Sequence, residues 1–395
     1  MNHTSAEQRF CRESGALRSD WSVILANFLV ALPCLASILL SLSLFLLLCR
    51  HAVFHFNLRI IFASIALANC QFAIVRLCNV SWNVLDGIVE VFSGNDSSYC
   101  EGVMTQRDCC WIWCPGLIGG MGMVWNLIVL AGERVYSAVK YREYEQVKST
   151  AFAWSLSLLI AFNSASGILA DDAVGQQRVL QCSPLSSAAV GSAKQAFVAS
   201  VILESLLFLL FLAVQSYNRS RQKKVRVGHS TGQSVSVVVN GVDVVQPDNA
   251  AAAVVTTAQI ANGAAQLSQR YQANENVKMT RLILKLLASH FLCMVPPQMS
   301  LIYFNSGGLD DLSIRGIIGA EVFHSLISIL AVVNGSIFAL LNIRNSSLLS
   351  EKARKWLPDS IGKWLFPKKF VAEDIVAEEH NVDPFEAIHW AWRRY

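Results

Sequence analysis

The chain has 395 residues, of which 53% are hydrophobic and only 15% are charged, and its mean hydropathy is positive. An average soluble domain carries about 25% charged residues, so this composition indicates a chain solvated largely by lipid and argues against an ordinary soluble domain. The net charge of +4 is too small to indicate a partner such as nucleic acid.

A helix that crosses a bilayer needs about 20 largely apolar residues, because the hydrocarbon core is about 30 Å thick and each residue rises about 1.5 Å. Backbone groups in lipid must be hydrogen-bonded within the protein, which favours helices over open strands. Seven segments with at most one charged residue each meet or approach this length. The sequence therefore predicts an all-α membrane protein, a seven-transmembrane helix bundle with helices at about 23–49, 60–80, 109–132, 149–170, 195–218, 282–304 and 316–343.

The segments around this membrane domain, residues 23–345, are more polar. Residues 1–22 form an N-terminal tail in which no cleavable signal peptide is apparent. The loop 217–280 opens with a basic run and continues in small, repetitive residues, which is typical of disorder. In the tail 346–395, Leu348–Leu357 has apolar and basic faces, which predicts an amphipathic helix along the inner membrane surface.

Basic residues orient the bundle, because Lys and Arg collect in cytoplasmic loops. With the N-terminus outside, the cytoplasmic segments hold 23 Lys and Arg residues and the outer segments hold 8. The N-terminus is therefore expected to lie outside the cell. On that side, Asn2, Asn79 and Asn95 begin glycosylation sequons.

Cysteines also gather near the predicted outer face, where disulfides persist. Cys182 is the only cysteine between the predicted fourth and fifth helices, and a bond to Cys109 would tie that loop to the top of the third helix. Cys100, Cys110 or Cys114 could compete with Cys109, because disulfide connectivity cannot be read from sequence alone.

The inner end of the third helix carries Glu133-Arg134, followed by Tyr136. Such a pair can hold a charge-assisted contact at rest and release the arginine toward a cytoplasmic partner on activation. Alternatively, these charges mark only the point where the helix leaves the membrane. In the sixth helix, Pro296 and Pro297 remove two backbone donors and predict a bend, so that its inner end can swing outward and open a cytoplasmic cleft.

A charged side chain at bilayer depth costs about 2.5–3.5 kcal/mol, so each one is a candidate ligand contact. Arg76 and Glu321 lie near the outer ends of the second and seventh helices, where they could pair above a ligand cavity, and Glu204 and His290 lie near mid-membrane. The alternative for each is a satisfied contact between helices. His324, one turn from Glu321, is a further candidate ligand contact. Glu321 and His324 share a helix face as Glu-x-x-His, but a second such pair is missing, so no metal or other cofactor is predicted.

Several motifs resemble those of the nematode chemoreceptors of the Sra superfamily, a group of G-protein-coupled receptors, with the Srab and Sre branches closest. The segment 267–276 is similar to the family's L-S-x-R-Y-Q-x-x-E-N signature, and Glu133-Arg134 followed by Tyr144-Glu145 matches its E-R…Y-E spacing. Cys100 and Cys109 flank the outer end of the third helix as in that family. The other matching residues are His55 and Asn57 before the second helix and, within the signature, Arg270, Tyr271, Gln272, Glu275 and Asn276.

More general receptor motifs are present in altered form. The run 293–296 resembles C-W-x-P without its Trp. Asn334 and Phe338 begin and end a run that resembles N-P-x-x-Y, with Gly for Pro and Phe for Tyr. Asn69 stands where the larger class has Asp, which argues against an inner sodium site.

The resemblance implies a plasma-membrane receptor, in sensory cilia by analogy, that binds an external small-molecule ligand. It would activate a heterotrimeric G protein through the cytoplasmic ends of the third, fifth and sixth helices. A seven-helix transporter or channel is one alternative, although the chain shows no internal repeat. A membrane-embedded metal-dependent enzyme is another, although it would need His and Asp residues converging at one depth. No catalytic residue is predicted.

Overall fold

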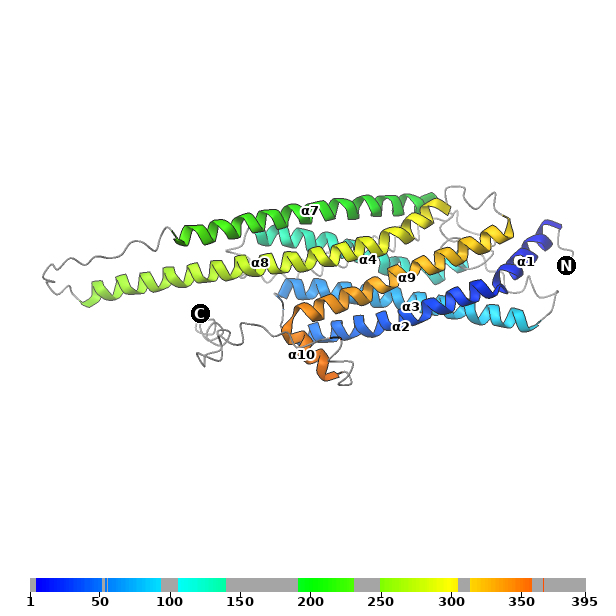
Figure 1. The fold of residues 1–395 in the computed structure, drawn as a ribbon, viewed down its shortest axis with the longest axis horizontal. Coiled ribbons are helices and arrows are strands. Elements are labelled where there is room, and N and C mark those ends of the chain that lie inside the picture. Colours follow the sequence, from blue (N-terminus) through cyan, green and yellow to red (C-terminus); the bar gives the residue numbers. More distant parts are fainter. Residues whose placement is uncertain are drawn as a thin grey trace. The chain divides into compact units, whose positions relative to one another are not determined.

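The computed structural model describes residues 5–51, 54, 56–93, 106–139, 191–230, 249–304, 313–356 and 365. All regular elements in these ranges are helices (Figure 1). The predicted fourth transmembrane helix, at residues 149–170, lies outside the described residues. The chain divides into two compact units, residues 1–342 and 343–395.

Six of the seven predicted spans coincide with described helices. Five of these helices contain a stretch long and apolar enough to cross a membrane, namely α2 (Trp21–Arg50), α3 (Phe56–Ser93), α7 (Gly191–Ser230), α8 (Asn249–Tyr303) and α9 (Ile314–Asn345). The sixth, α4 (Gln106–Val139), contains the uncharged run predicted as the third span. Many large apolar side chains on α2 and α7 are exposed, as expected where lipid is the solvent.

Three helices extend well beyond their predicted limits. α3 continues to Ser93 instead of ending near residue 80, and α7 continues to Ser230. α8 begins at Asn249, within the loop expected to be disordered. The segment at the start of α8 is rich in Ala, the residue with the highest helix propensity, and this explains why low-complexity sequence is helical here.

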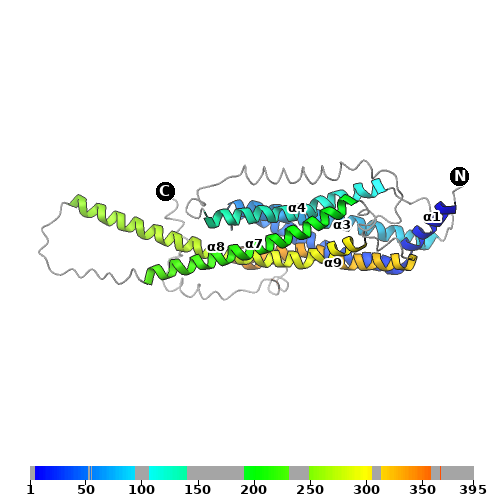
Figure 2. The same cartoon turned by 90° about the horizontal axis from the view of Figure 1, so that it is seen from above.

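Within residues 1–342, α2 packs along α3, α3 along α4, and α7 along α8 (Figures 1 and 2). α9 joins this bundle through apolar contacts and close backbone approach. Val332 packs in one buried cluster with Val30, Cys34 and Val80, which come from α2 and α3. At Gly335 a Cβ atom would collide with Ser37 Oγ and lie 3.2 Å from Asn69 Cβ, so α9 approaches α2 and α3 where glycine leaves room.

The N-terminal tail contains a helix that the sequence did not predict, α1 (Ser5–Arg18). Its last residue, Arg18, donates from Nη1 to Asp86 Oδ2 at 3.1 Å, and both groups form an ion pair. Asp86 lies on the part of α3 that extends beyond the predicted span. At the neighbouring Gly87, a Cβ atom would lie 2.7 Å from the Arg18 carbonyl oxygen, so glycine permits α1 to lie against α3.

In residues 343–395, the short helix α10 (Ser347–Trp356) follows α9 where the sequence predicted an amphipathic helix. Ser346 begins it, because the Ser346 hydroxyl accepts a hydrogen bond from the Leu349 backbone N–H at 3.3 Å. Lys355 Nζ lies 3.0 Å from Glu351 Oε1, one turn away. The hydrogen bond and positive charge of Lys355 lower the pKa of the Glu351 carboxyl.

Candidate functional site

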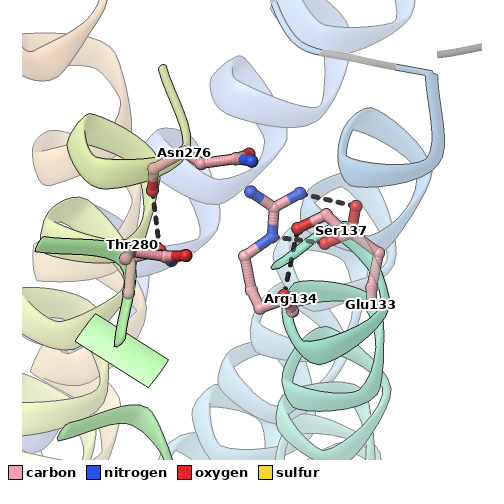
Figure 3. A network of polar contacts seen from close by, with 6 residues as sticks. Glu133, Arg134, Ser137, Asn276 and Thr280 are labelled. Atoms are coloured by element: carbon pink, nitrogen blue, oxygen red, sulfur yellow. Dashed lines mark hydrogen bonds and ion pairs between the residues drawn. The ribbon is translucent and has the colours of Figure 1, made fainter. Parts of the chain in front are cut away.

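The inner end of α4 holds a buried ion pair. The side chains of Glu133 and Arg134 are 6% and 2% exposed, and Arg134 donates from Nε and Nη2 to the two carboxylate oxygens of Glu133. This bidentate arrangement neutralises both charges within the helix. Ser137 Oγ donates to the Arg134 carbonyl oxygen at 3.0 Å (Figure 3).

α7 and α8 are joined by a hydrogen bond close to this pair, near the inner ends of their predicted membrane spans. Asn218 Nδ2 on α7 donates to Thr280 Oγ1 on α8 at 3.0 Å, and Thr280 Oγ1 donates to the Asn276 carbonyl oxygen at 2.7 Å. Figure 3 shows the Arg134 guanidinium on the side of α4 that faces Asn276 and Thr280. We call these residues the inner cluster: Glu133, Arg134, Ser137, Asn218, Asn276 and Thr280.

A second polar group, the outer cluster, consists of Arg76, Ser300, Glu321, His324 and Ser328. Arg76 on α3 is 3% exposed and donates from Nη2 to Ser328 Oγ on α9 at 2.9 Å. It also interacts electrostatically with the Glu321 carboxylate. Ser300 Oγ on α8 lies 3.0 Å from His324 Nδ1. The structure thus brings together three of the sequence-predicted ligand contacts and links α3, α8 and α9.

The other two predicted ligand contacts, Glu204 and His290, lie in a third group that we call the Glu204 cluster. Glu204 Oε1 accepts from Ser200 Oγ and from Gln298 Nε2, each at 3.2 Å, and lies 3.6 Å from His290 Nε2. His290 Nδ1 lies 3.1 Å from Asn334 Nδ2. The cluster, whose members are Ser200, Glu204, His290, Gln298 and Asn334, therefore links α7 to α9 through α8.

The remaining predicted switch residues occupy different environments. Pro296 lies within α8, which continues through both prolines to Tyr303. Phe338 on α9 is 6% exposed, and its ring meets Phe62 of α3 edge-on with centroids 6.0 Å apart. Tyr136, in contrast, is 42% exposed.

Asn79 is the one predicted glycosylation acceptor whose side chain the structure describes. It is 2% exposed and lies inside α3, which contains the whole predicted span 60–80 and continues to Ser93. An acceptor must be accessible to receive a glycan, so this placement argues against glycosylation at Asn79.

Several predicted residues fall outside the described part of the chain or have side chains that are not described. Asn57 is described at the start of α3, and Asn276 in the inner cluster. The predicted disulfide partners Cys109 and Cys182 belong to this group, so the disulfide stays a prediction. The remaining members of the group are Asn2, Asn95, His55, Tyr144, Glu145, Arg270, Tyr271, Gln272 and Glu275.

Reasoning from sequence missed the uncharged partners of these groups, among them Gln298, Ser328 and Thr280. One available signal was spacing, because Ser200 and Glu204 are four residues apart and therefore share a helix face. Polar residues on one face of an apolar helix indicate contacts between helices. Among the described residues, no three His, Cys, Asp or Glu side chains could hold a metal ion.

No curated protein matches the chain. A family model described as serpentine type 7TM GPCR chemoreceptor Sra matches residues 6–231, more than half of the chain. The match is to Sra itself and does not support a particular relation to the Srab and Sre branches. With its apolar helices packed as a bundle and the Glu133-Arg134 pair at one end, the chain belongs to the Sra family of seven-transmembrane G-protein-coupled chemoreceptors.

Proposed function

We propose that this multi-pass membrane receptor binds an external small molecule and activates a heterotrimeric G protein through the inner ends of α4, α7 and α8. Its site of action would be the plasma membrane, in sensory cilia by family analogy. The observation that carries the proposal is the buried Glu133–Arg134 pair, whose guanidinium faces the α7–α8 contact. The family is one of receptors, and we propose no enzymatic activity.

In the resting state, Glu133 neutralises Arg134, and Asn218 holds the inner end of α8 through Thr280. The Asn218–Thr280 hydrogen bond depends on α7 and α8 staying together, whereas the Glu133–Arg134 pair lies within α4. If α8 moves away from α4 and α7, the hydrogen bond to Asn218 breaks and the Arg134 side chain gains access to the space at the inner face. A ligand shifts this equilibrium by binding the open arrangement more tightly than the closed one.

The test is a G-protein signalling assay in cells that express the chain, screened against volatile and water-soluble chemicals. We expect Arg134→Ala to abolish the response while surface expression persists, because the variant retains the helices but lacks the released cation. Arg315→Ala is the matched control, since Arg315 is exposed at the opposite end of the bundle on α9. An unchanged response in Arg134→Ala would refute the proposed coupling.

The inner cluster supplies a second variant for the same assay. Asn218→Ala removes the side chain that donates to Thr280, so the closed arrangement loses a buried hydrogen bond. We expect a higher signal without added chemical, because the equilibrium moves toward the open form. A basal signal equal to that of the unmodified receptor would show that this contact does not restrain α8.

A further inference from the structure

The Glu204 cluster contains two buried oxygen atoms that lack hydrogen-bond donors. Glu204 is 0% exposed, and its contacts with Ser200, Gln298 and His290 all involve Oε1. Its second oxygen, Oε2, has no hydrogen-bond partner among the described residues, and neither has Gln298 Oε1. Because Gln298 donates from Nε2 to Glu204 Oε1, these two orphan acceptors belong to neighbouring side chains.

Among the residues that the structure describes, no Lys or Arg side chain contacts the Glu204 cluster. Asn334 Nδ2 is a donor, so His290 Nδ1 accepts its hydrogen bond, and the proton of a neutral ring is then on Nε2. That N–H faces Glu204 Oε1 at 3.6 Å and leaves the negative charge of the carboxylate uncompensated. A buried carboxylate at membrane depth is stabilised by a cation that also satisfies its oxygens.

We infer that the Glu204 cluster binds the ammonium group of a small organic amine, an inference that rests on the proposed ligand-binding function. One ammonium group supplies three N–H donors and one positive charge. It therefore satisfies both Glu204 Oε2 and Gln298 Oε1 and balances the carboxylate. A water molecule would supply two donors but no charge, so it would satisfy the hydrogen-bond acceptors without balancing the carboxylate.

Glu204 lies in the outer part of the apolar span of α7, and aromatic side chains follow it toward the inner end. Glu204 lies six residues beyond Val198, where the apolar span of α7 begins, which is about 9 Å along the helix. One turn further along α7 is Phe208, whose ring lies 6.2 Å from that of Phe291, the residue after His290. This aromatic pair provides apolar surface about one helical turn inward from Glu204.

The test measures thermal unfolding of the full-length chain purified in detergent at neutral pH, with n-butylammonium chloride and 1-butanol as probes. We expect n-butylammonium to raise the unfolding midpoint with increasing concentration, and 1-butanol at equal concentrations to leave it unchanged. Glu204→Gln should weaken the apparent affinity for n-butylammonium by about tenfold or more, because a charge-assisted hydrogen bond is lost. Glu90→Gln, which removes the same charge from α3, should retain the full response.

Three results would overturn the inference. Equal shifts with n-butylammonium and 1-butanol would mean that charge is not recognised, and a full shift in Glu204→Gln would place binding elsewhere. A Glu204-dependent shift on replacing N-methylglucamine chloride with sodium chloride, without one from n-butylammonium, would assign the site to an inorganic cation. The probe comparison on the unmodified protein needs no variant, and Gln298→Met is a second variant if Glu204→Gln does not fold.

This measurement contains no G protein, so it is independent of the signalling assay. A shift with n-butylammonium but no signalling from the receptor would leave the amine site intact and remove the proposed coupling. Signalling that depends on Arg134, without any amine-specific shift in the unfolding midpoint, would support the proposed coupling and remove the amine site.

Discussion

The outer cluster and the Glu204 cluster are both buried among membrane-spanning helices, but they differ in charge balance. In the outer cluster, the Arg76 guanidinium interacts with the Glu321 carboxylate and donates to Ser328 at 2.9 Å. In the Glu204 cluster, a fully buried carboxylate lies 3.6 Å from His290, a side chain that can be neutral. One of its oxygens has no hydrogen-bond partner among the described residues. Burial alone therefore does not separate a structural contact from a ligand site, whereas the balance of charges and hydrogen bonds does.

The largest effect is expected from a substitution in the outer cluster, whose charges are balanced. Arg76→Met should lower the free energy of unfolding by about 3–5 kcal/mol, because removing one partner of a buried pair leaves the other charge uncompensated. The measurement is unfolding of the purified variant in detergent. Adding Glu321→Gln to Arg76→Met should recover much of the loss, since the remaining charge is then removed as well. No recovery would mean that Arg76 acts through Ser328 alone.

The positions of the membrane spans were predictable from sequence because length and apolar composition are local properties. Six of the predicted spans coincide with described helices, namely α2, α3, α4, α7, α8 and α9. The helical segments outside the lipid were not predictable in the same way. α1 and the extension of α3 lie against each other through Arg18 and Asp86, and no local pattern in either segment reveals that contact.

The candidate sites were predictable only in part, for a related physical reason. Charged residues such as Arg76 and Glu204 stand out in apolar helices because their burial is costly. Their partners Ser328 and Gln298 are neutral, and such residues occur in membrane helices at little cost. Which of them faces a given charge depends on the rotation and register of each helix, and these follow from packing at close contacts such as Gly335.

A smaller effect is expected from substituting His290. The charge of this residue decides whether the Glu204 cluster is a balanced ion pair or a cation-binding site. His290→Leu removes the hydrogen bond to Asn334 and leaves a buried amide without a partner, so the free energy of unfolding should fall by about 1–3 kcal/mol. The double variant with Asn334→Leu should be closer to the unmodified protein, because both polar partners are then absent. Unfolding in detergent measures both.

The size of the His290→Leu effect also tests the comparison between the clusters. A loss as large as that of Arg76→Met would indicate that His290 is protonated and forms an ion pair with Glu204. The Glu204 cluster would then be balanced like the outer cluster, and an amine would have no charge to neutralise.

The smallest expected effect has the opposite sign. Glu204→Gln should raise the free energy of unfolding of the ligand-free protein by about 1 kcal/mol, because the new amide replaces the uncompensated charge. Its oxygen can still accept from Ser200 and Gln298, and its N–H₂ group can donate to the orphan Gln298 Oε1. The matched control is Glu321→Gln, which should destabilise the protein because it removes the carboxylate that interacts with the buried Arg76 guanidinium. If Glu204→Gln were as destabilising as Glu321→Gln in detergent unfolding, Glu204 would be part of a balanced structural contact, and the reason to assign a cation to it would be lost.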